Sequence, residues 1–275
     1  MQHDLRLVSF DIARTMGIAD LRHIKPERMF AHLGELRDAD WVLFPEEWQL
    51  GALVDALKCR VFPSVQSYRY GQDKIQFTRA LQALSPEHLP DTLIERAEPE
   101  TALRVAEHFG FPFVVKTPRS SMGQGVFRVE SRRDLMGLLP GLDVLYAQQF
   151  LDIERDLRVV WIGDRVVCAY WREGGDGFHH NVARGGALNF DGVPGEALDL
   201  VHDAATGLGI NHGGFDLAFA DGQWFFLEVN VRFGNAGLKA AGIDPAASIL
   251  DWLKRNTPDR NDPSGPREPP VALAG

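Results

Sequence analysis

The chain has 275 residues, of which 45% are hydrophobic and 24% are charged. These are the proportions of an ordinary globular protein, and they exclude a wholly disordered or collagen-like chain. Lysine and arginine number 29 against 38 acidic residues, which gives a net charge of −9. Because a nucleic-acid-binding surface needs clustered positive charge, we expect no nucleic-acid partner. At this length we expect one large domain or two tightly joined ones.

The cysteine content indicates a reducing compartment. Only Cys59 and Cys168 are present, too few for a disulfide framework and without the paired spacing of a zinc site. The first 15 residues contain no long apolar segment, and no run of 18 apolar residues occurs in the chain. We therefore expect a cytoplasmic location, no signal peptide and no membrane partner. The sequence leaves homo-oligomerisation open.

The first 64 residues are typical of a small α/β unit. Apolar runs at 5–10 and 41–45 predict two strands, and the mixed segment 25–39 between them predicts a helix. Apolar residues at helical spacing predict a second helix over 46–58, and strand character returns at 59–64. This alternation predicts a parallel sheet.

The rest of the chain mixes helices with hairpins. We expect helices over 72–84, 99–109, 195–207 and 245–255, and strands over 92–95, 111–117, 125–130, 144–150, 157–162, 165–171, 214–219 and 223–230. Gly163-Asp164 and Asp221-Gly222 are expected to form tight turns. Five of the last 20 residues are proline, so we expect 256–275 to be a disordered tail.

Three oxygen-bearing side chains at the last hairpin are candidate metal ligands. If this hairpin turns at 221–223, Asp216 lies opposite Glu228, and alternation places Asn230 on the same face. Two carboxylates and an amide suit Mg²⁺, which keeps other positions for water and phosphate. The alternative is that the three are solvated polar positions, and the residues alone leave both interpretations equally open.

Lys116 ends an apolar strand and is followed by a loop rich in serine and glycine. Such a loop offers a charge and approachable N–H groups to phosphate oxygens. The segment is neither a Walker A nor a G-x-G-x-x-G motif. Taken alone, a plain hairpin turn explains it better.

Arg158, Arg172 and Arg184 are candidates to clamp a phosphoryl group or a carboxylate. For any single one, a solvated position at a strand edge is the simpler interpretation. The neighbouring His179 and His180 are weak candidates for a metal pair, because adjacent residues of extended backbone point in different directions.

Taken in order, these features resemble the ATP-grasp superfamily, in particular its RimK-type carboxylate–amine ligase branch. The resemblance covers about residues 40–255. It is carried by DKIQFTRAL, LPDTLI, FPFVVKTPRSSMGQGVF, AQQFL, RDLRVVWIGDRVVCAYWR, FHHNVARGG, GFDLAF and FLEVNVRFGNAGLKAAGID.

The resemblance implies an α/β ATP-grasp fold built from three subdomains. These would be a short N-terminal Rossmann-like subdomain (1–71), a central subdomain with a lid loop (72–145) and a C-terminal subdomain with the magnesium site (146–255), before the tail.

It also implies roles for individual residues. Lys74 and Lys116 would bind the phosphates of ATP, beneath a lid loop that includes Ser120, Ser121, Gly123 and Gly125. Adenine would be read by the hinge residues Gln148, Gln149, Phe150 and Leu151. Mg²⁺, or Mn²⁺ in its place, would bind Asp216, Glu228 and Asn230. The phosphoryl group and the acyl substrate would face Arg158, Arg172, Asn181 and Arg184.

The implied activity is ATP-dependent amide formation through an acylphosphate, between a small-molecule carboxylate and an amine such as an amino acid or peptide. The alternatives are a small-molecule kinase and a nucleotide-binding module without turnover. The chain departs from the family pattern at Gln148-Gln149, at Phe178-His179-His180-Asn181 and at Val231-Arg232-Phe233-Gly234. The last two departures lie at positions where the substrates of family members differ. The resemblance therefore does not imply that glutamate is a substrate.

Overall fold

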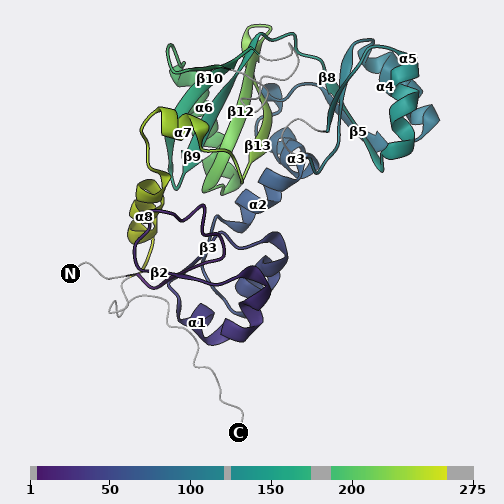
Figure 1. Ribbon diagram of the computed structural model, residues 1–275. Helices are drawn as coiled ribbons and strands as arrows, with labels where there is room; N and C mark the ends of the chain where they lie inside the picture. The colour runs from purple at the N-terminus through teal and green to yellow at the C-terminus, as the bar shows by residue number, and fades with distance from the viewer. Residues whose placement is uncertain (1–4, 121–124, 175–186, 259–275) are drawn as a thin grey trace.

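The computed structural model describes residues 5–120, 125–174 and 187–258, which form three sheets of four, five and four strands (Figure 1). None of the helices in these ranges is long and apolar enough to cross a lipid bilayer. The mixed α/β architecture agrees with the predicted fold class.

The N-terminal sheet has the order β2-β1-β3-β4, and all its pairings are parallel, as predicted. Its strands are β1 (Leu7–Ser9), β2 (Leu21–His23), β3 (Trp41–Leu43) and β4 (Val61–Phe62). The predicted helix over 25–39 is a 3₁₀ helix, Pro26–His32, followed by α1 (Leu33–Asp38). The helix expected over 46–58 is also wrong in type: it is a 3₁₀ turn, Glu47–Gln49, followed by the π-helix Gly51–Ala56.

The central sheet has the order β5-β8-β6-β7 and is antiparallel. Helices α4 and α5 lie together on one side of it (Figure 1) and share a hydrophobic core with its strands. The elements are β5 (Thr92–Arg96), α4 (Pro99–Phe109), β6 (Phe113–Lys116), β7 (Val126–Val129), α5 (Arg132–Leu138) and β8 (Val144–Gln149).

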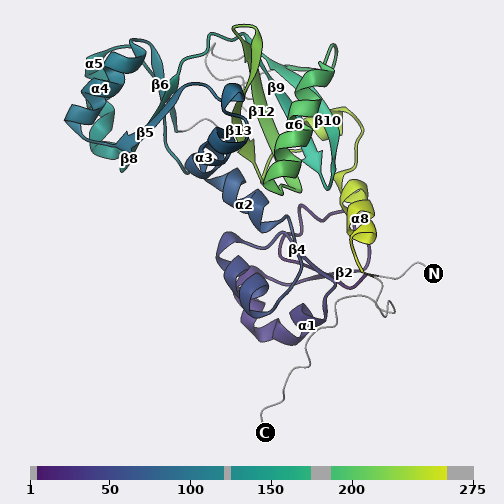
Figure 2. The same ribbon diagram turned by 180° about the vertical axis from the view of Figure 1, so that it is seen from behind.

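The C-terminal sheet has the order β11-β10-β9-β12-β13 and is also antiparallel. Seen from behind, α6 lies across it (Figure 2). The elements are β9 (Arg155–Ile162), β10 (Arg165–Glu173), β11 (Ala187–Asn189), α6 (Gly195–Leu208), β12 (His212–Ala220), β13 (Gln223–Asn230), α7 (Ala236–Ala240) and α8 (Pro245–Arg255). Both predicted tight turns are present: Gly163 and Asp164 join β9 to β10, and Asp221 and Gly222, with φ of 51° and 79°, join β12 to β13.

Two helices connect the N-terminal sheet to the rest of the molecule. They are α2 (Val65–Gln72), which the sequence did not predict, and α3 (Lys74–Leu84). The predicted subdomain boundary at residue 72 assigns α3 to the central subdomain. Its buried Phe77 and Leu81, however, pack in the core of the C-terminal sheet.

The chain beyond α8 is ordered a little further than predicted. The expected tail starts at 256, but the indole N–H of Trp41 donates a 2.8 Å hydrogen bond to the hydroxyl of Thr257. This bond ties the end of the described chain to β3, and residues 259–275 lie outside the described ranges.

Candidate nucleotide and metal site

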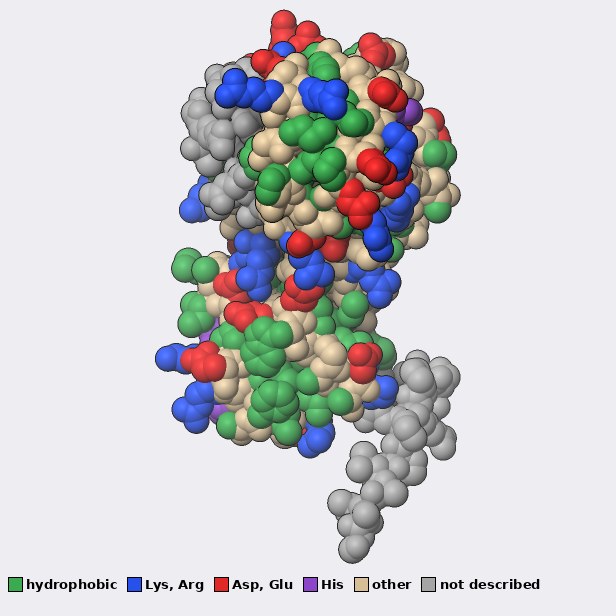
Figure 3. Space-filling view, turned by 90° about the vertical axis from the view of Figure 1, so that its right-hand side faces the viewer, with side chains coloured by type: hydrophobic (Ala, Val, Ile, Leu, Met, Phe, Trp, Pro, Cys, Tyr) green, Lys and Arg blue, Asp and Glu red, His purple; other side chains and the backbone are tan. Residues whose placement is uncertain are grey.

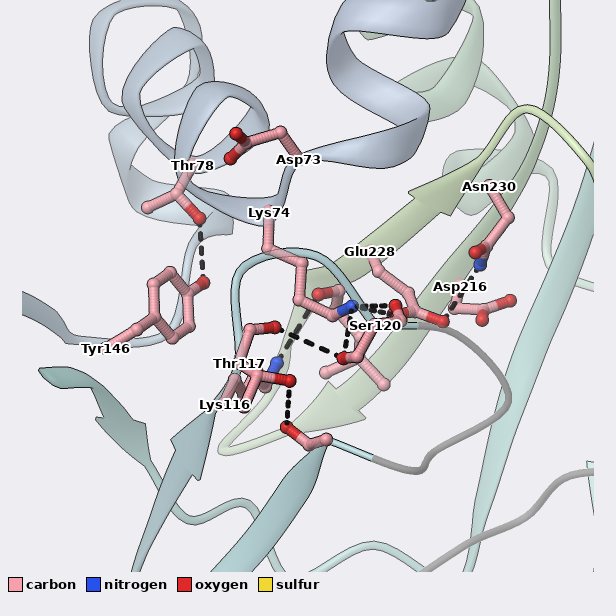
Figure 4. Close-up of polar contacts among 12 residues, drawn as sticks. Asp73, Lys74, Thr78, Lys116, Thr117, Ser120, Tyr146, Asp216, Glu228 and Asn230 are labelled. Carbon is pink, nitrogen blue, oxygen red and sulfur yellow. Dashed lines mark hydrogen bonds and ion pairs between the residues drawn. The ribbon is translucent and has the colours of Figure 1, made fainter. Parts of the chain in front are cut away.

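The three candidate metal ligands lie at the end of the β12–β13 hairpin. Asp216 pairs with Glu228 across the two strands, as predicted, and Asn230 pairs with Gly214. The turn is one residue shorter than the predicted 221–223, because Ala220 pairs with Gln223, and a register shift between Asp216 and Leu217 restores the predicted pairing. The Asn230 amide donates a 2.8 Å hydrogen bond to Glu228 Oε1 (Figure 4). The predicted juxtaposition is therefore confirmed, while the metal-binding role of the three residues stays a prediction.

Asp216 is buried and bound to two arginines, Arg158 on the adjacent strand β9 and Arg172 on β10, the next strand but one. Arg158 donates from Nε to Oδ1 and from Nη2 to Oδ2, the latter at 2.9 Å, and Arg172 Nη2 lies 3.0 Å from Oδ2. Burial alone would raise the pKa of Asp216, but the two guanidinium groups outweigh it and hold the pKa below its usual value. The carboxylate is therefore ionised and held in place by its partners.

Asp156 is a member of this cluster that the sequence reasoning missed. Its carboxylate accepts hydrogen bonds of 2.6 and 2.7 Å from Arg172, which lies opposite it on β10. Burial raises the pKa of Asp156 against the attraction of Arg172. The signal was present, because Asp156 and Arg158 are two residues apart on one strand and therefore share a face.

Lys74 begins α3, where the Asp73 side chain caps the helix by accepting from the N–H groups of Ile75 and Gln76. Its ammonium donates a 2.7 Å hydrogen bond to the carbonyl of Ser120 and lies 3.4 Å from Glu228 Oε2 (Figure 4). The cap thus places a cation beside the candidate metal site. A small pocket opens here, lined by residues of α2, α3 and β13 and by Ser120.

Lys116, at the end of β6, also reaches this site, where its ammonium lies 3.5 Å from the carbonyl oxygen of Leu227 on β13. Its ammonium donates a 2.6 Å hydrogen bond to Gln148 Oε1. Burial disfavours the charged form and lowers the pKa of Lys116 to about 8, although Glu228 partly offsets the effect. A bound phosphate would supply the counter-charge that this lysine lacks.

The loop after Lys116 is closed by a contact between its two ends. The N–H of Thr117 donates a 2.7 Å hydrogen bond to the carbonyl of Gly125. A Cβ at Gly125 would lie 1.8 Å from Thr117 Oγ1 and 2.4 Å from Ser120 Oγ, so only glycine fits. Ser121 and Gly123, also predicted to belong to the lid, lie outside the described residues.

Polar groups of the predicted hinge form hydrogen bonds with other parts of the protein. Gln148 binds Lys116 through Oε1 and the Thr92 hydroxyl through Nε2, and the N–H of Gln149 donates to the carbonyl of Asp91. Arg128 stacks on the ring of Phe150 at 4.5 Å, and Leu151 follows. The reading of adenine by this segment stays a prediction.

The donor set fits Mg²⁺. Oxygen atoms of two carboxylates and an amide at neighbouring strand positions are the ligands that this hard cation prefers. Asp216 is held by two arginines, whereas the Glu228 side chain is 25% exposed beside Asn230. Glu228 and Asn230 are therefore the accessible donors. Asn181 and Arg184, expected to face the substrate, lie outside the described ranges, as do His179 and His180.

The charges of the whole site favour a polyanion. Lys74, Lys116, Arg158 and Arg172 supply four positive charges against three from Asp156, Asp216 and Glu228, a net charge of +1. The chain as a whole is acidic, so this cluster differs in sign from its surroundings. Positive charge in a cleft attracts phosphates selectively.

The fold is that of the ATP-grasp enzymes. The ATP-grasp ligase PsnB, solved with its minimal precursor, superposes with a TM-score of 0.69 at 17% identity over 93% of this chain and 100% of that one. A RimK domain protein of Sphaerobacter thermophilus gives 0.63 at 16% identity, covering 90% and 98%. D-alanine–D-alanine ligase of Bacillus anthracis gives 0.63 at 14% identity, covering 86% and 85%.

The sequence comparisons narrow this class to one family. Residues 71–253 match the RimK-like ATP-grasp domain, and the chain therefore belongs to the RimK-like ATP-grasp family. A probable alpha-L-glutamate ligase of Haemophilus ducreyi is 31% identical over 208 residues, 72% of this chain and 67% of the relative. A relative from Enterobacter sp. with the same name is 30% identical over 188 residues, 65% and 63%.

A third relative is the ribosomal protein bS6–L-glutamate ligase of Escherichia fergusonii, 29% identical over 192 residues, 66% of this chain and 64% of the relative. The chain thus matches about two thirds of the length of these curated relatives. The resemblance predicted from the motifs is confirmed at the level of family and fold.

Proposed function

We propose that the protein is an ATP- and Mg²⁺-dependent carboxylate–amine ligase that forms an amide bond through an acylphosphate. The observation that carries the proposal is the convergence of Lys74, Lys116 and two buried arginines around Glu228 and Asn230. These groups can bind a nucleotide and neutralise a phosphoryl group, and the reaction needs no nucleophile from the chain.

In the first step, an oxygen of the substrate carboxylate attacks the γ-phosphorus of ATP and ADP leaves. Lys74 on α3 and Lys116 on β6 bind the phosphate oxygens and orient the γ-phosphate for the incoming carboxylate. Arg158 and Arg172 offset the negative charge that builds up on the phosphoryl oxygens. When bound, Mg²⁺ neutralises phosphate charge at Glu228 and Asn230.

In the second step, the amine nitrogen attacks the acyl carbon and phosphate leaves with the bond electrons, while the nitrogen loses a proton. The same arginines balance the charge of the leaving phosphate. Ser120 lies beside Lys74, with its carbonyl 2.7 Å from the ammonium, and we propose that the lid loop to which it belongs helps to exclude water from the acylphosphate.

The substrates we propose are a small-molecule carboxylate and an amine, such as amino acids or peptides. The names of the relatives favour glutamate as one partner and a protein as the other. The sequence departs from the family pattern at 178–181 and 231–234, where substrates differ between members, and for this reason we do not propose glutamate as the specific substrate. We place the protein in the cytoplasm, where ATP is available.

The test is ADP release by the full chain with ATP, Mg²⁺ and pairs of amino acids and short peptides, followed by mass spectrometry. We expect ADP and an amide product whose mass equals the sum of the two substrate masses less one water. A stable phosphorylated product without an amide would instead identify a kinase. Nucleotide binding without ADP release under all conditions would identify a non-catalytic module.

A further inference from the structure

A second pocket lies on the other face of the C-terminal sheet from the nucleotide site, where α6 begins. Its volume is about 620 Å³, within the range of about 300–1,000 Å³ that is typical of ligand sites. Alternation along β9 and β10 separates the two sites: Asp156 and Arg172 point to the charged cluster, whereas their neighbours Arg155 and Trp171 line this pocket. None of the described residues that line it was assigned to nucleotide or metal binding.

Three aromatic side chains form an apolar wall of this pocket. Trp171 and Trp224 are buried, with ring centroids 5.8 Å apart, in the core that the sheet shares with α6, the helix seen across this face in Figure 2. Phe219 lies opposite Trp224 in the β12–β13 hairpin, with ring centroids 5.2 Å apart, and is 47% exposed. Phe219 therefore offers an accessible ring to a ligand.

Part of this wall already binds a guanidinium group. The Cζ atom of Arg155 lies 3.9 Å from the centroid of the Trp171 ring, and its Nη1 donates a 2.9 Å hydrogen bond to Glu173. Such cation–π contacts involve arginine more often than lysine. Within the described part of the chain, no cation stacks on Phe219 or Trp224. The accessible part of the wall thus lacks the cation that the Trp171 part has.

The polar rim of the pocket is acidic. Asp152, Glu154 and Glu196, all exposed, supply three negative charges against one positive charge from Arg155, a net charge of −2. The Trp224 indole N–H donates a 2.8 Å hydrogen bond to Glu196 Oε1, which positions this carboxylate and leaves Oε2 for a ligand. On the side of the molecule seen in Figure 3, by contrast, acidic and basic side chains are interspersed. The pocket therefore favours a cation.

We infer that this pocket binds an arginine side chain of a polypeptide partner, with the guanidinium group stacked on Phe219 and paired with Glu196. Arginine fits better than lysine, because a planar guanidinium both stacks on an aromatic ring and matches a carboxylate with paired donors. Free arginine fits less well, because the acidic rim repels its own carboxylate, whereas a peptide bond is neutral. The inference goes beyond the proposed ligase function and does not depend on it.

The test is calorimetric titration of the full chain with acetyl-Leu-Arg-Leu-amide. The matched probe acetyl-Leu-citrulline-Leu-amide keeps the shape of the side chain without its charge and should bind at least about tenfold more weakly. Acetyl-Leu-Lys-Leu-amide and free L-arginine should also bind more weakly. Saturating ADP with Mg²⁺ should leave the affinity for the arginine peptide unchanged, since the two sites lie on opposite faces of the sheet.

Substitutions at exposed positions separate binding from folding. Glu196→Gln still accepts from Trp224 but loses the charge, and Phe219→Leu stays apolar but loses the ring; each should weaken binding about threefold. Arg155→Gln should instead tighten binding about threefold, because it removes the competing cation and uncovers a second ring. Glu100→Gln, at an exposed position of α4, is the control and should leave the affinity unchanged.

Equal affinity for the arginine and citrulline peptides, or unchanged affinity in Glu196→Gln and Phe219→Leu, would overturn the inference. Competition by ADP would also overturn it and would assign the peptide to the nucleotide site. Dimerisation of the chain that the arginine peptide reverses would identify a second copy as the occupant instead. Because these titrations need no turnover, failure of the proposed ligase activity would show separately, as absence of ADP release in the substrate screen.

Discussion

Glu228 has a different neighbour on each carboxylate oxygen. Oε1 accepts from the amide of Asn230, and Oε2 lies 3.4 Å from the ammonium of Lys74. The residue therefore links a candidate metal ligand to a candidate phosphate ligand. Substituting it tests both assignments without removing a large side chain.

Glu228→Gln keeps the shape of the side chain and removes its charge. We expect ADP release to fall by about 100-fold or more, because electrostatic stabilisation of the transferred group is lost. The free energy of unfolding should change by less than about 1 kcal/mol, since the ion pair with Lys74 is partly exposed. Glu95→Gln, at an exposed position of β5, is the matched control. Unchanged ADP release in Glu228→Gln would contradict the metal assignment.

Lys116 should make nucleotide binding depend on pH. Its pKa is lowered to about 8, so the ammonium loses its proton as the pH rises through that value, whereas a solvated lysine stays charged to about pH 10.4. ADP affinity should therefore fall as the pH rises above about 8, measured by calorimetry. Lys116→Met should bind ADP more weakly and lose this pH dependence.

The lowered pKa of Lys116 affects stability in the opposite direction: the free energy of unfolding should rise with pH, whereas ADP affinity falls. Between pH about 8 and 10.4 the unfolded chain carries a proton on this lysine that the folded chain has lost. Lys116 thus contributes an unfolding free energy that rises with pH over that window. A wild-type stability profile there identical to that of Lys116→Met would argue against the shifted pKa.

At the level of elements, the charged cluster ties three strands together. Asp156 on β9, Arg172 on β10 and Asp216 on β12 form a chain of buried ion pairs. Arg172 lies opposite Asp156 and reaches across β9 to Asp216. Removing one member of such a set leaves a charge buried without its partner. That costs far more than the loss of an exposed pair.

Asp156→Asn should lower the free energy of unfolding by about 3 kcal/mol, measured by urea denaturation, because Arg172 loses its bidentate partner. Asp164→Asn, which breaks the exposed pair with Arg255, should cost less than about 1 kcal/mol. Equal effects of the two substitutions would show that the buried cluster adds no stability of its own.

Elements with a local signature could be predicted from the sequence. The β12–β13 hairpin could be predicted from Asp221-Gly222, which accepts the positive φ of a tight turn. The Asp216–Glu228 pairing was predicted for a turn at 221–223; the turn is one residue shorter, and a register shift between Asp216 and Leu217 restores the predicted pairing. Helix α2 was missed because VQSYRYGQ has few apolar residues; its start is marked only by Ser64, which accepts from the N–H of Ser67.

Contacts that depend on the tertiary fold could not be predicted in this way. The pairing of Lys116 with Gln148 joins β6 to β8, and the hydrogen bond from Arg14 to the carbonyl of Phe233 joins the loop after β1 to the segment after β13. Neither has a spacing in the sequence that would reveal it. The residue types of the site and the Asp216–Glu228 pairing could therefore be predicted from the sequence, whereas the contacts of the site residues with other strands could not.

At the level of the whole molecule, the candidate site lies between two bodies with separate cores. The C-terminal sheet and α3 share one core, and the central sheet with α4 and α5 has another. A nucleotide that contacts both would stabilise the folded chain beyond either part alone. Its effect on global stability is therefore a measure of whether the site is assembled.

ADP with Mg²⁺, at 100 times its dissociation constant, should raise the free energy of unfolding by about 2.7 kcal/mol. With ADP at the same fixed concentration, Mg²⁺ should add less stability to Glu228→Gln than to the wild type, measured by denaturation at matched concentrations. If Mg²⁺ stabilises both proteins equally in the presence of ADP, the cation binds elsewhere.

The packing of α2 and α3 determines which residues of the site move as one rigid unit. Gly71 lies so close to β13 that a Cβ there would come within 2.5 Å of the nitrogen of Val231, and α3 is buried against the C-terminal sheet. Lys74, Glu228 and Asn230 thus belong to one rigid unit, whereas Lys116 belongs to another. A rotation of the central sheet would move Lys116 away from the site, while the distances among Lys74, Glu228 and Asn230 would not change. A bound polyphosphate would then lose its contact with Lys116 and keep its contacts with the other three residues.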